Sequence, residues 1–156
     1  MRIRRNEKGF TLIELLIVVA IIGIIAAIAI PNLLNAIQRG KQKRTMADMR
    51  AIATSVEAFA VDNNRYPGGA SPIVNIASEL EPKFIRSVPR LDAWNTAFDY
   101  TSSPTSNAQS YTIVSYGKDG AADTGSYTSG TQTTDFNNDI CFSGGSFVVF
   151  PEGSQQ

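Results

Sequence analysis

The feature that most constrains this chain is an uncharged run of apolar residues near its amino terminus. Residues 15–30 read LLIVVAIIGIIAAIAI, and extension back to Phe10 adds only two polar residues, Thr11 and Glu14. About 20 apolar residues in a helix are enough to cross the hydrocarbon core of a bilayer. A helix buried in a water-soluble domain rarely needs to be apolar on every side. We therefore predict a membrane-spanning helix.

A cleaved secretory signal peptide is the alternative interpretation of a basic start followed by an apolar run. The run is longer than a usual signal-peptide core, and Ile28-Ala29-Ile30 leads straight into Pro31 without a small-x-small cleavage site. Basic residues lie on both sides of the span, so charge counting does not decide its orientation. They are Arg2, Arg4, Arg5 and Lys8 before it, and Arg39, Lys41, Lys43 and Arg44 after it.

Composition argues against several classes of function. The chain has no histidine, which excludes Ser-His and Cys-His catalytic pairs and histidine-ligated zinc. No glycine-rich phosphate loop is present, and the net charge of zero argues against a general nucleic-acid binder. The single cysteine, Cys141, cannot form an intrachain disulfide. We expect it to be a small buried residue, with an intermolecular bridge as the alternative.

The segment Lys8-Gly9-Phe10-Thr11-Leu12-Ile13-Glu14 opens the apolar run. It resembles the processing site of type IV prepilins and type II secretion pseudopilins. The resemblance implies that a prepilin peptidase cuts between Gly9 and Phe10, removes the basic leader 1–9 and methylates the new amino terminus of Phe10. Glycine lacks a Cβ, so its backbone can approach a peptidase closely. The resemblance also implies a single-pass inner-membrane protein with a cytoplasmic amino terminus and a periplasmic C-terminal domain.

Glu14 is a carboxylate near one end of an apolar span, which is costly and by default suggests a function. A side chain about one helical turn from the interface could instead snorkel to water. In the resembled family the matching glutamate pairs with the terminal amine of a neighbouring subunit. Carried over, Glu14 would pair with the amine of Phe10 in the next subunit, because an unpaired carboxylate in lipid is heavily penalised.

Gly23 and Pro31 lie within the apolar helix. Pro31 removes one helical hydrogen bond and is expected to produce a kink, which could serve packing alone. Family filaments commonly lose helix around the matching positions. The stretch from Gly23 to Pro31 is therefore a candidate for extension during assembly.

The predicted helix continues beyond the span as an amphipathic half. We assign residues 10–33 to the membrane and filament-core half and residues 34–62 to the amphipathic half. From Met46 onward the apolar positions are spaced by three or four residues, which predicts a face that seats a domain. These positions are Met46, Met49, Ile52, Ala53, Val56, Phe59 and Ala60.

Residues 63–156 are predicted to form a periplasmic β domain. Tyr111 to Ser115 and Phe147 to Phe150 indicate strands, and residues 120–135 indicate a long loop. We expect an α+β pilin fold, in which the long N-terminal helix packs against a small antiparallel sheet that carries a long C-terminal loop. The lone aromatic residues Trp94, Phe98 and Tyr100 are expected in the core.

Three segments of this domain resemble the major pseudopilin of type II secretion. They are Asp92 to Tyr100, Tyr111 to Gly120 and Asn138 to Ile140. The turn after the tryptophan departs from the family pattern Gly-Asn-Pro, and the chain continues past Ile140 for longer than expected. The resemblance implies a subunit of a type II secretion pseudopilus, and the alternative is the major pilin of a surface type IV pilus. The implied partners are further copies of the chain, the prepilin peptidase, the inner-membrane assembly platform and minor pseudopilins or pilins.

The major pseudopilins bind calcium in their last loop through oxygen ligands, as a hard cation requires. The matching positions are the backbone carbonyls of Tyr116 and Phe136 and the side chains of Asp119, Asn138 and Asp139, with Asp123 and Asp135 as further candidates. The alternative is a polar loop whose Asp and Asn side chains make turn hydrogen bonds.

Arg39, Lys41, Lys43, Arg44 and Arg50 form a basic cluster just beyond the span. Such a cluster is usually a solvated face, but it could also meet lipid headgroups or the acidic surface of a neighbouring subunit. Nucleic-acid binding is disfavoured because no aromatic residues are interleaved with the basic ones.

Overall fold

The computed structural model describes residues 9–124 and 127–152, and the chain divides into two compact units, Met1–Ala36 and Ile37–Gln156. A single long helix, α1 (Leu12–Asn63), contributes its first half to one unit and its second half to the other. Apart from Gly9, the predicted leader lies outside the described residues.

The first unit contains the apolar start of α1. Its large side chains are solvent-exposed in the isolated chain, for example 83% for Phe10 and 65% for Ile24. Among the described residues, α1 is the helix that is long and apolar enough to cross a membrane, with a mean hydropathy of 3.1 over its most apolar window. An apolar surface exposed on all sides is compatible with lipid or with packing against other helices. The backbone is helical through Gly23 and Pro31, so local loss of helix on assembly stays a prediction.

In the second unit, α1 supplies one wall of the hydrophobic core. Met49, Ile52, Ala53, Val56 and Phe59 are buried against residues of the sheet, so the predicted apolar face is confirmed at these positions. Met46 packs at the edge of the core and Ala60 is half-buried. The face also buries polar residues that the apolar pattern did not reveal, namely Gln42, Thr45 and Ser55.

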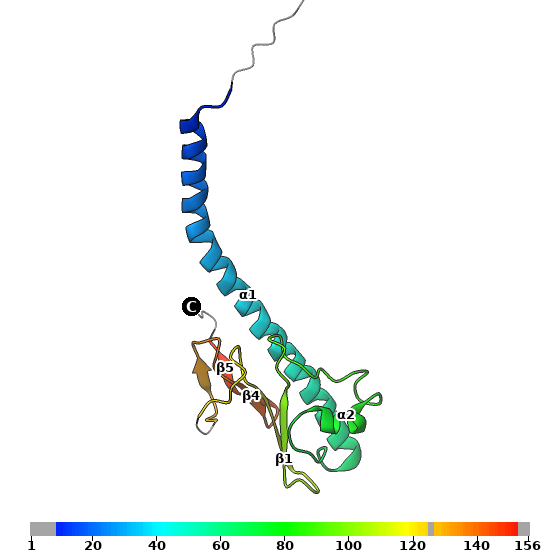
Figure 1. Ribbon diagram of the computed structural model, residues 1–156. Helices are drawn as coiled ribbons and strands as arrows, with labels where there is room; N and C mark the ends of the chain where they lie inside the picture. The colour runs from blue at the N-terminus through cyan, green and yellow to red at the C-terminus, as the bar shows by residue number, and fades with distance from the viewer. Residues whose placement is uncertain (1–8, 125–126, 153–156) are drawn as a thin grey trace, which may run out of the picture. The chain divides into compact units, whose positions relative to one another are not determined.

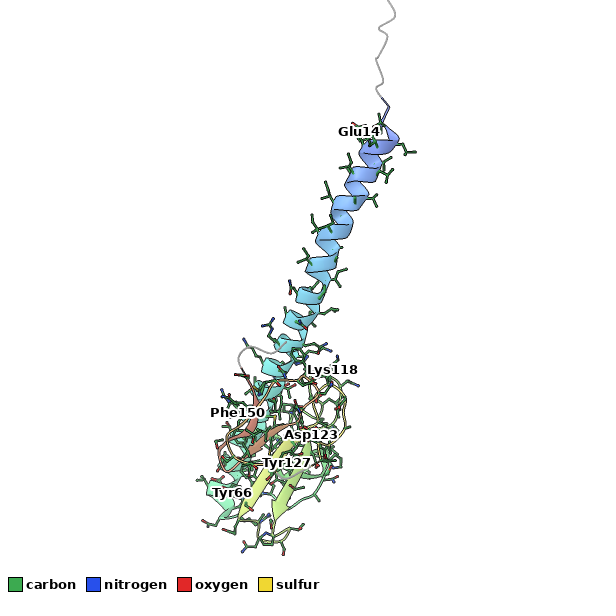
Figure 2. The ribbon with its side chains drawn as sticks, turned by 90° about the vertical axis from the view of Figure 1, so that its left-hand side faces the viewer. Glu14, Tyr66, Lys118, Asp123, Tyr127 and Phe150 are labelled. Carbon is green, nitrogen blue, oxygen red and sulfur yellow. The ribbon has the colours of Figure 1, made fainter. Side chains whose placement is uncertain are left out.

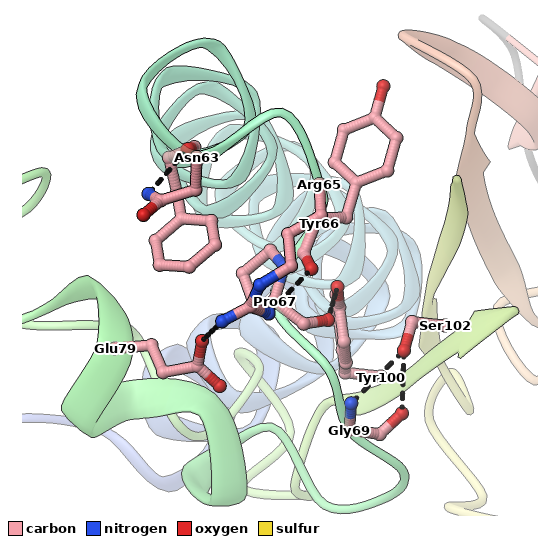
Figure 3. Close-up of polar contacts among 9 residues, drawn as sticks. Asn63, Arg65, Tyr66, Pro67, Gly69, Glu79, Tyr100 and Ser102 are labelled. Atoms are coloured by element: carbon pink, nitrogen blue, oxygen red, sulfur yellow. Dashed lines mark hydrogen bonds and ion pairs between the residues drawn. The ribbon is translucent and has the colours of Figure 1, made fainter. Parts of the chain in front are cut away.

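The carboxyl end of α1 is closed by asparagines. The Asn63 amide donates to the carbonyl of Phe59 at 2.8 Å, and Asn64 adopts a left-handed conformation with φ of 54°. Asparagine tolerates this conformation, which commonly ends helices. Figure 3 shows the contacts that follow, including Arg65 to Glu79 and the Tyr100 hydroxyl donating to the carbonyl of Pro67.

The described strands form one five-stranded sheet in the order β1-β2-β4-β5-β3. Figure 1 shows β4 and β5 side by side. Their bounds are β1 (Asp99–Ser103), β2 (Ser110–Ser115), β3 (Thr131–Thr133), β4 (Ile140–Ser143) and β5 (Ser146–Pro151). The expected strands at 111–115 and 147–150 are present as β2 and β5. Phe98 and Tyr100 are fully buried, as predicted, and so is Cys141, whose burial raises the thiol pKa to about 11.

Two details of the predicted β domain are wrong. The sheet is mixed rather than antiparallel, because β3 runs parallel to β5 with Thr131 opposite Val149. The expected loop 120–135 contains β3, a strand without an apolar pattern that forms through pairing with the distant β5. The short helix α2 (Val74–Leu80) was not expected, and it buries Ile76, Ala77 and Leu80 in the core.

Trp94 is half-buried rather than in the core. Its indole Nε1 donates to the side-chain oxygen of Gln38 at 2.8 Å, which holds the turn beside α1. The buried Asp92 carboxylate organises the same turn by accepting from the backbone N–H groups of Trp94 and Thr96, both at 2.9 Å, and from the Ser115 hydroxyl at 2.7 Å. Three donors on one buried carboxylate satisfy the need of a buried charge for partners.

Candidate functional site

The amino end of α1 is organised by Thr11 and Glu14. The Thr11 backbone N–H donates to Oε2 of Glu14 at 2.8 Å, and the Thr11 hydroxyl donates to the same oxygen at 2.7 Å. The Glu14 backbone N–H lies 3.3 Å from the Thr11 hydroxyl oxygen. Because α1 begins at Leu12, this is a capping box, with Thr11 at the N-cap and Glu14 at the third helical position.

The capping box leaves the Glu14 carboxylate both anchored and available. Both Thr11 donors bond to Oε2, and Oε1 accepts no hydrogen bond from any described residue. Figure 2 shows Glu14 at the amino end of α1. One oxygen therefore stabilises the helix start, while the other can receive a donor from outside the chain.

Gly9 and Phe10 are both exposed. A Cβ built on Gly9 meets no atom within 4 Å, and the backbone of Gly9 is not in the left-handed region. The fold of the described residues therefore does not itself require glycine at this position. A requirement for glycine at position 9 would therefore come from outside the fold. The peptidase that is predicted to bind and cut this segment would impose it.

The last loop places one buried carboxylate, Asp139, among polar partners. Its Oδ2 accepts from the Tyr127 hydroxyl at 2.6 Å and from the Asp123 N–H at 3.0 Å, while the Asp139 N–H donates to Oδ2 of Asp123 at 2.9 Å. Asp123 and Tyr127, both labelled in Figure 2, are thus held together by their contacts to Asp139. Asp139 is only 1% exposed although it carries a carboxylate. Tyr127 was missed at the sequence level, where its signal was a lone aromatic in a Gly/Ser/Thr-rich loop.

The residues of the other predicted calcium ligands also make hydrogen bonds within the chain. The Phe136 carbonyl accepts from the N–H of Lys118 at 2.9 Å, Asp119 accepts from the N–H of Ala121 at 3.1 Å, and Asn138 accepts from the N–H of Asp135 at 3.3 Å. The Tyr116 hydroxyl donates to Asp99. Asp135 itself accepts from the N–H of Asn137 at 3.0 Å. The contacts of Asp119, Asn138 and Asp135 are turn contacts, as the alternative interpretation of a plain polar loop expects. Those of Phe136 and Tyr116 join segments that are distant in the sequence.

Two observations bear on whether this loop can hold a cation. Oδ1 of Asp139 is buried and has no hydrogen-bond partner in the described part of the chain. Burial, followed by the nearby carboxylates of Asp123 and Asp119, raises the pKa of Asp139 against the lowering effect of its hydrogen bonds. Among the described residues no three His, Cys, Asp or Glu side chains are gathered as a metal site. The donor set thus fits a hard cation only if carbonyl and amide oxygens complete it.

Gly117 brings two segments of this loop into contact. Its φ is +62°, and a Cβ there would lie 2.7 Å from the Asn138 carbonyl oxygen and also against Asn137. Only glycine lets the chain after β2 approach the segment before β4 so closely. The position of the candidate ligands therefore depends on this residue.

We expect Gly117→Ala to lower the free energy of unfolding by about 2 to 5 kcal/mol, the sum of left-handed strain and overpacking. Gly144→Ala is the matched control, because Gly144 has a φ of +59° but no atom within 4 Å of an added Cβ. It should cost only the strain, about 1 to 2 kcal/mol. Thermal unfolding of the detergent-solubilised chain measures both, and equal losses would refute the close approach at Gly117.

The family described as "Type II secretion system (T2SS), protein G" matches residues 32–134, and the "Prokaryotic N-terminal methylation motif" matches residues 4–30. The chain is 30% identical over 131 residues to a type II secretion system core protein G of Aeromonas hydrophila, covering 78% of this chain and 90% of that protein. It is 29% identical over 135 residues to that of Vibrio cholerae, covering 80% of this chain and 92% of the other. A type IV wide pilus major component, PilA4 of Thermus thermophilus, is 42% identical over 78 residues, which is 50% of this chain and 60% of that protein. No solved structure matches significantly.

Proposed function

Because the chain belongs to the type II secretion system protein G family, we propose that it polymerises into a pseudopilus that exports folded proteins. The observation that carries this proposal is the match of the family to residues 32–134, together with a helix start at which one carboxylate oxygen of Glu14 accepts no hydrogen bond from the described residues. A subunit of this kind acts by assembling and has no reaction to catalyse, in keeping with a sequence that lacks histidine.

The route to the filament follows from the amino-terminal segment. The methylation motif at residues 4–30 implies processing by a prepilin peptidase, and α1 provides a span for a single-pass inner-membrane anchor. In the proposed orientation the leader lies in the cytoplasm and the globular unit in the periplasm. The assembly platform would then extract mature subunits and add them to the pseudopilus with minor pseudopilins.

The chain isolated from cells with a working prepilin peptidase is expected to begin at Phe10 and to carry one N-terminal methyl group. Intact-protein mass spectrometry measures both changes at once. Gly9→Val is the matched control, because Gly9 is exposed and a Cβ added at position 9 meets no atom within 4 Å. That variant should remain full-length and folded. Recovery of wild-type protein with Met1 attached would overturn the processing step.

A surface type IV pilus remains the second candidate. It is favoured by the 42% identity to the Thermus thermophilus pilus component and by Asn95-Thr96-Ala97 in place of the family's usual turn after the tryptophan. The protein G relatives match a much larger share of the chain, which favours secretion. A strain that lacks the chain would lose export of folded proteins in the first case, and adhesion or motility in the second.

We also propose that calcium orders the last loop. Asp139 would hold the ion through Oδ1, which has no hydrogen-bond partner among residues 9–124 and 127–152. Asp119, Asn138 and the carbonyls of Tyr116 and Phe136 would be the further oxygen ligands. Bound calcium would offset the negative charge of the neighbouring carboxylates of Asp119, Asp123 and Asp139. Support comes from Oδ1 of Asp139, which is buried without a hydrogen-bond partner among the described residues, and from the raised pKa of the same carboxyl group.

A further inference from the structure

Four basic residues surround the membrane-proximal part of α1 in the globular unit. We call Arg39, Lys41, Lys43 and Arg44 the basic collar. Arg39, Lys43 and Arg44 are exposed and Lys41 is half-buried. Within the described residues Arg44 has an acidic partner, Asp48 at 3.7 Å, whereas the other three make no ion pair. The collar therefore presents a largely uncompensated positive charge.

The helix directs the collar away from the core. Arg39 and Lys43 are four residues apart and so share a face, while Gln42, Thr45 and Met49 face inward. Arg39 and Lys43 line a shallow hollow of about 90 Å³, which Gln42, Met46, Pro151 and Glu152 complete. Arg50 is excluded from the collar because its guanidinium lies over the Phe147 ring, 5.2 Å from the centroid.

We propose that the basic collar binds the headgroups of anionic phospholipids. Arg39 follows Ile30, the last residue of the uninterrupted apolar run, by nine residues. Leu33, Leu34 and Ile37 lie between them, so apolar side chains continue to two residues before Arg39. Two residues span at most about 7 Å, which is less than the Debye length of about 10 Å, so the collar begins within reach of the headgroups. Each lysine or arginine beside an anionic membrane surface increases the affinity for that surface by about fivefold.

Lipid is favoured over a second copy of the chain as the occupant. The proposed anchor holds the collar beside headgroups throughout the time before assembly, which gives them a high effective concentration. An acidic neighbour is present only after polymerisation. The proposal thus rests on the membrane anchor and not on secretion itself.

The chain contains its own reporter for this interaction. Trp94 is the single tryptophan, and its indole is bonded to Gln38, the residue before Arg39. Energy transfer from Trp94 to an acceptor on a lipid acyl chain therefore reports which lipids gather at the collar. The full-length protein is reconstituted in phosphatidylcholine vesicles with traces of acceptor-labelled phosphatidylglycerol or phosphatidylcholine. Flotation of the vesicles confirms insertion separately.

Wild-type protein should select labelled phosphatidylglycerol over labelled phosphatidylcholine, and high salt should weaken the selection. Arg39→Gln/Lys43→Gln should lower the ratio of transfer to labelled phosphatidylglycerol over labelled phosphatidylcholine towards one, because it removes two of the four charges of the collar. Arg86→Gln/Lys118→Gln is the control with the same change in charge, since both side chains are exposed. Glu152→Gln should increase the selectivity, because it removes the carboxylate beside the hollow.

Equal transfer to the two lipids in the wild type would overturn the proposal, as would equal losses in the two double variants. Transfer that depends on protein density but not on lipid charge would assign the collar to a second copy instead. An unchanged Trp94 emission spectrum shows that the Gln38 contact survives in each variant. Since no secretion component is present, failure here leaves the pseudopilus role standing. Unchanged export in a strain that lacks the chain would overturn that role and leave the lipid selectivity standing.

Discussion

Replacing Glu14 by alanine is expected to abolish filament assembly while membrane insertion continues. The apolar run that drives insertion is unchanged by this substitution. The proposed pair between Glu14 and the amine of Phe10 in the next subunit would be lost in a medium of low dielectric. Breaking such a pair costs about 3 to 5 kcal/mol, so subunit incorporation should fall by at least about 100-fold. Quantification of filaments against membrane-inserted protein measures the effect.

The capping box makes two control variants informative. Glu14→Gln keeps an acceptor for the Thr11 N–H, because glutamine also serves at the third position of a capping box. Thr11→Ala removes the cap at a cost of about 1 kcal/mol but keeps the carboxylate. If charge matters, Glu14→Gln fails to assemble and Thr11→Ala assembles. The reverse result would assign Glu14 to helix capping alone.

The sequence predicted what depends on local periodicity and missed what depends on distant partners. The buried face of α1 was predictable because Met49, Ile52 and Val56 recur at helical spacing. Thr45 gave no such signal, since its hydroxyl is satisfied by the N–H of Ala93, 48 residues away. The strand β3 escaped for the same reason, because only its pairing with β5 makes it a strand.

The candidate site shows the same division. Gly9, Phe10 and Glu14 could be singled out because a motif meets the edge of an apolar span. The spacing of Thr11 and Glu14 is that of a capping box, but the hydrogen bonds between them were needed to recognise the capping role of Thr11. The burial of Asp139 and its bond to Tyr127 could not be read, because neither residue lies in a periodic segment.

Calcium is expected to raise the melting temperature of the full-length chain, and chelation should reverse the change. At a free concentration 100 times the dissociation constant, a ligand adds about 2.7 kcal/mol. For a globular unit of this size that corresponds to a shift on the order of 10 °C. Asp139→Asn should remove the response, because it neutralises the buried carboxylate. Asp135→Asn is the matched control in the same loop, since Asp135 is exposed and makes a turn contact that asparagine can keep.

The pH dependence supplies an independent test of the same carboxylate. The pKa of Asp139 in the folded chain is raised above its ordinary value of 3.8, chiefly by burial. The folded state therefore binds the proton more tightly than the unfolded state does, and stability falls as pH rises from 3.8 through the raised pKa. Calcium should flatten this decline by favouring the ionised form, and Asp139→Asn should abolish it without calcium. If the part of the stability that depends on Asp139 instead rose with pH in the calcium-free chain, the folded state would favour the ionised carboxylate. That result would contradict the burial of Oδ1 without a hydrogen-bond partner among the described residues, and with it the reason for placing an ion there.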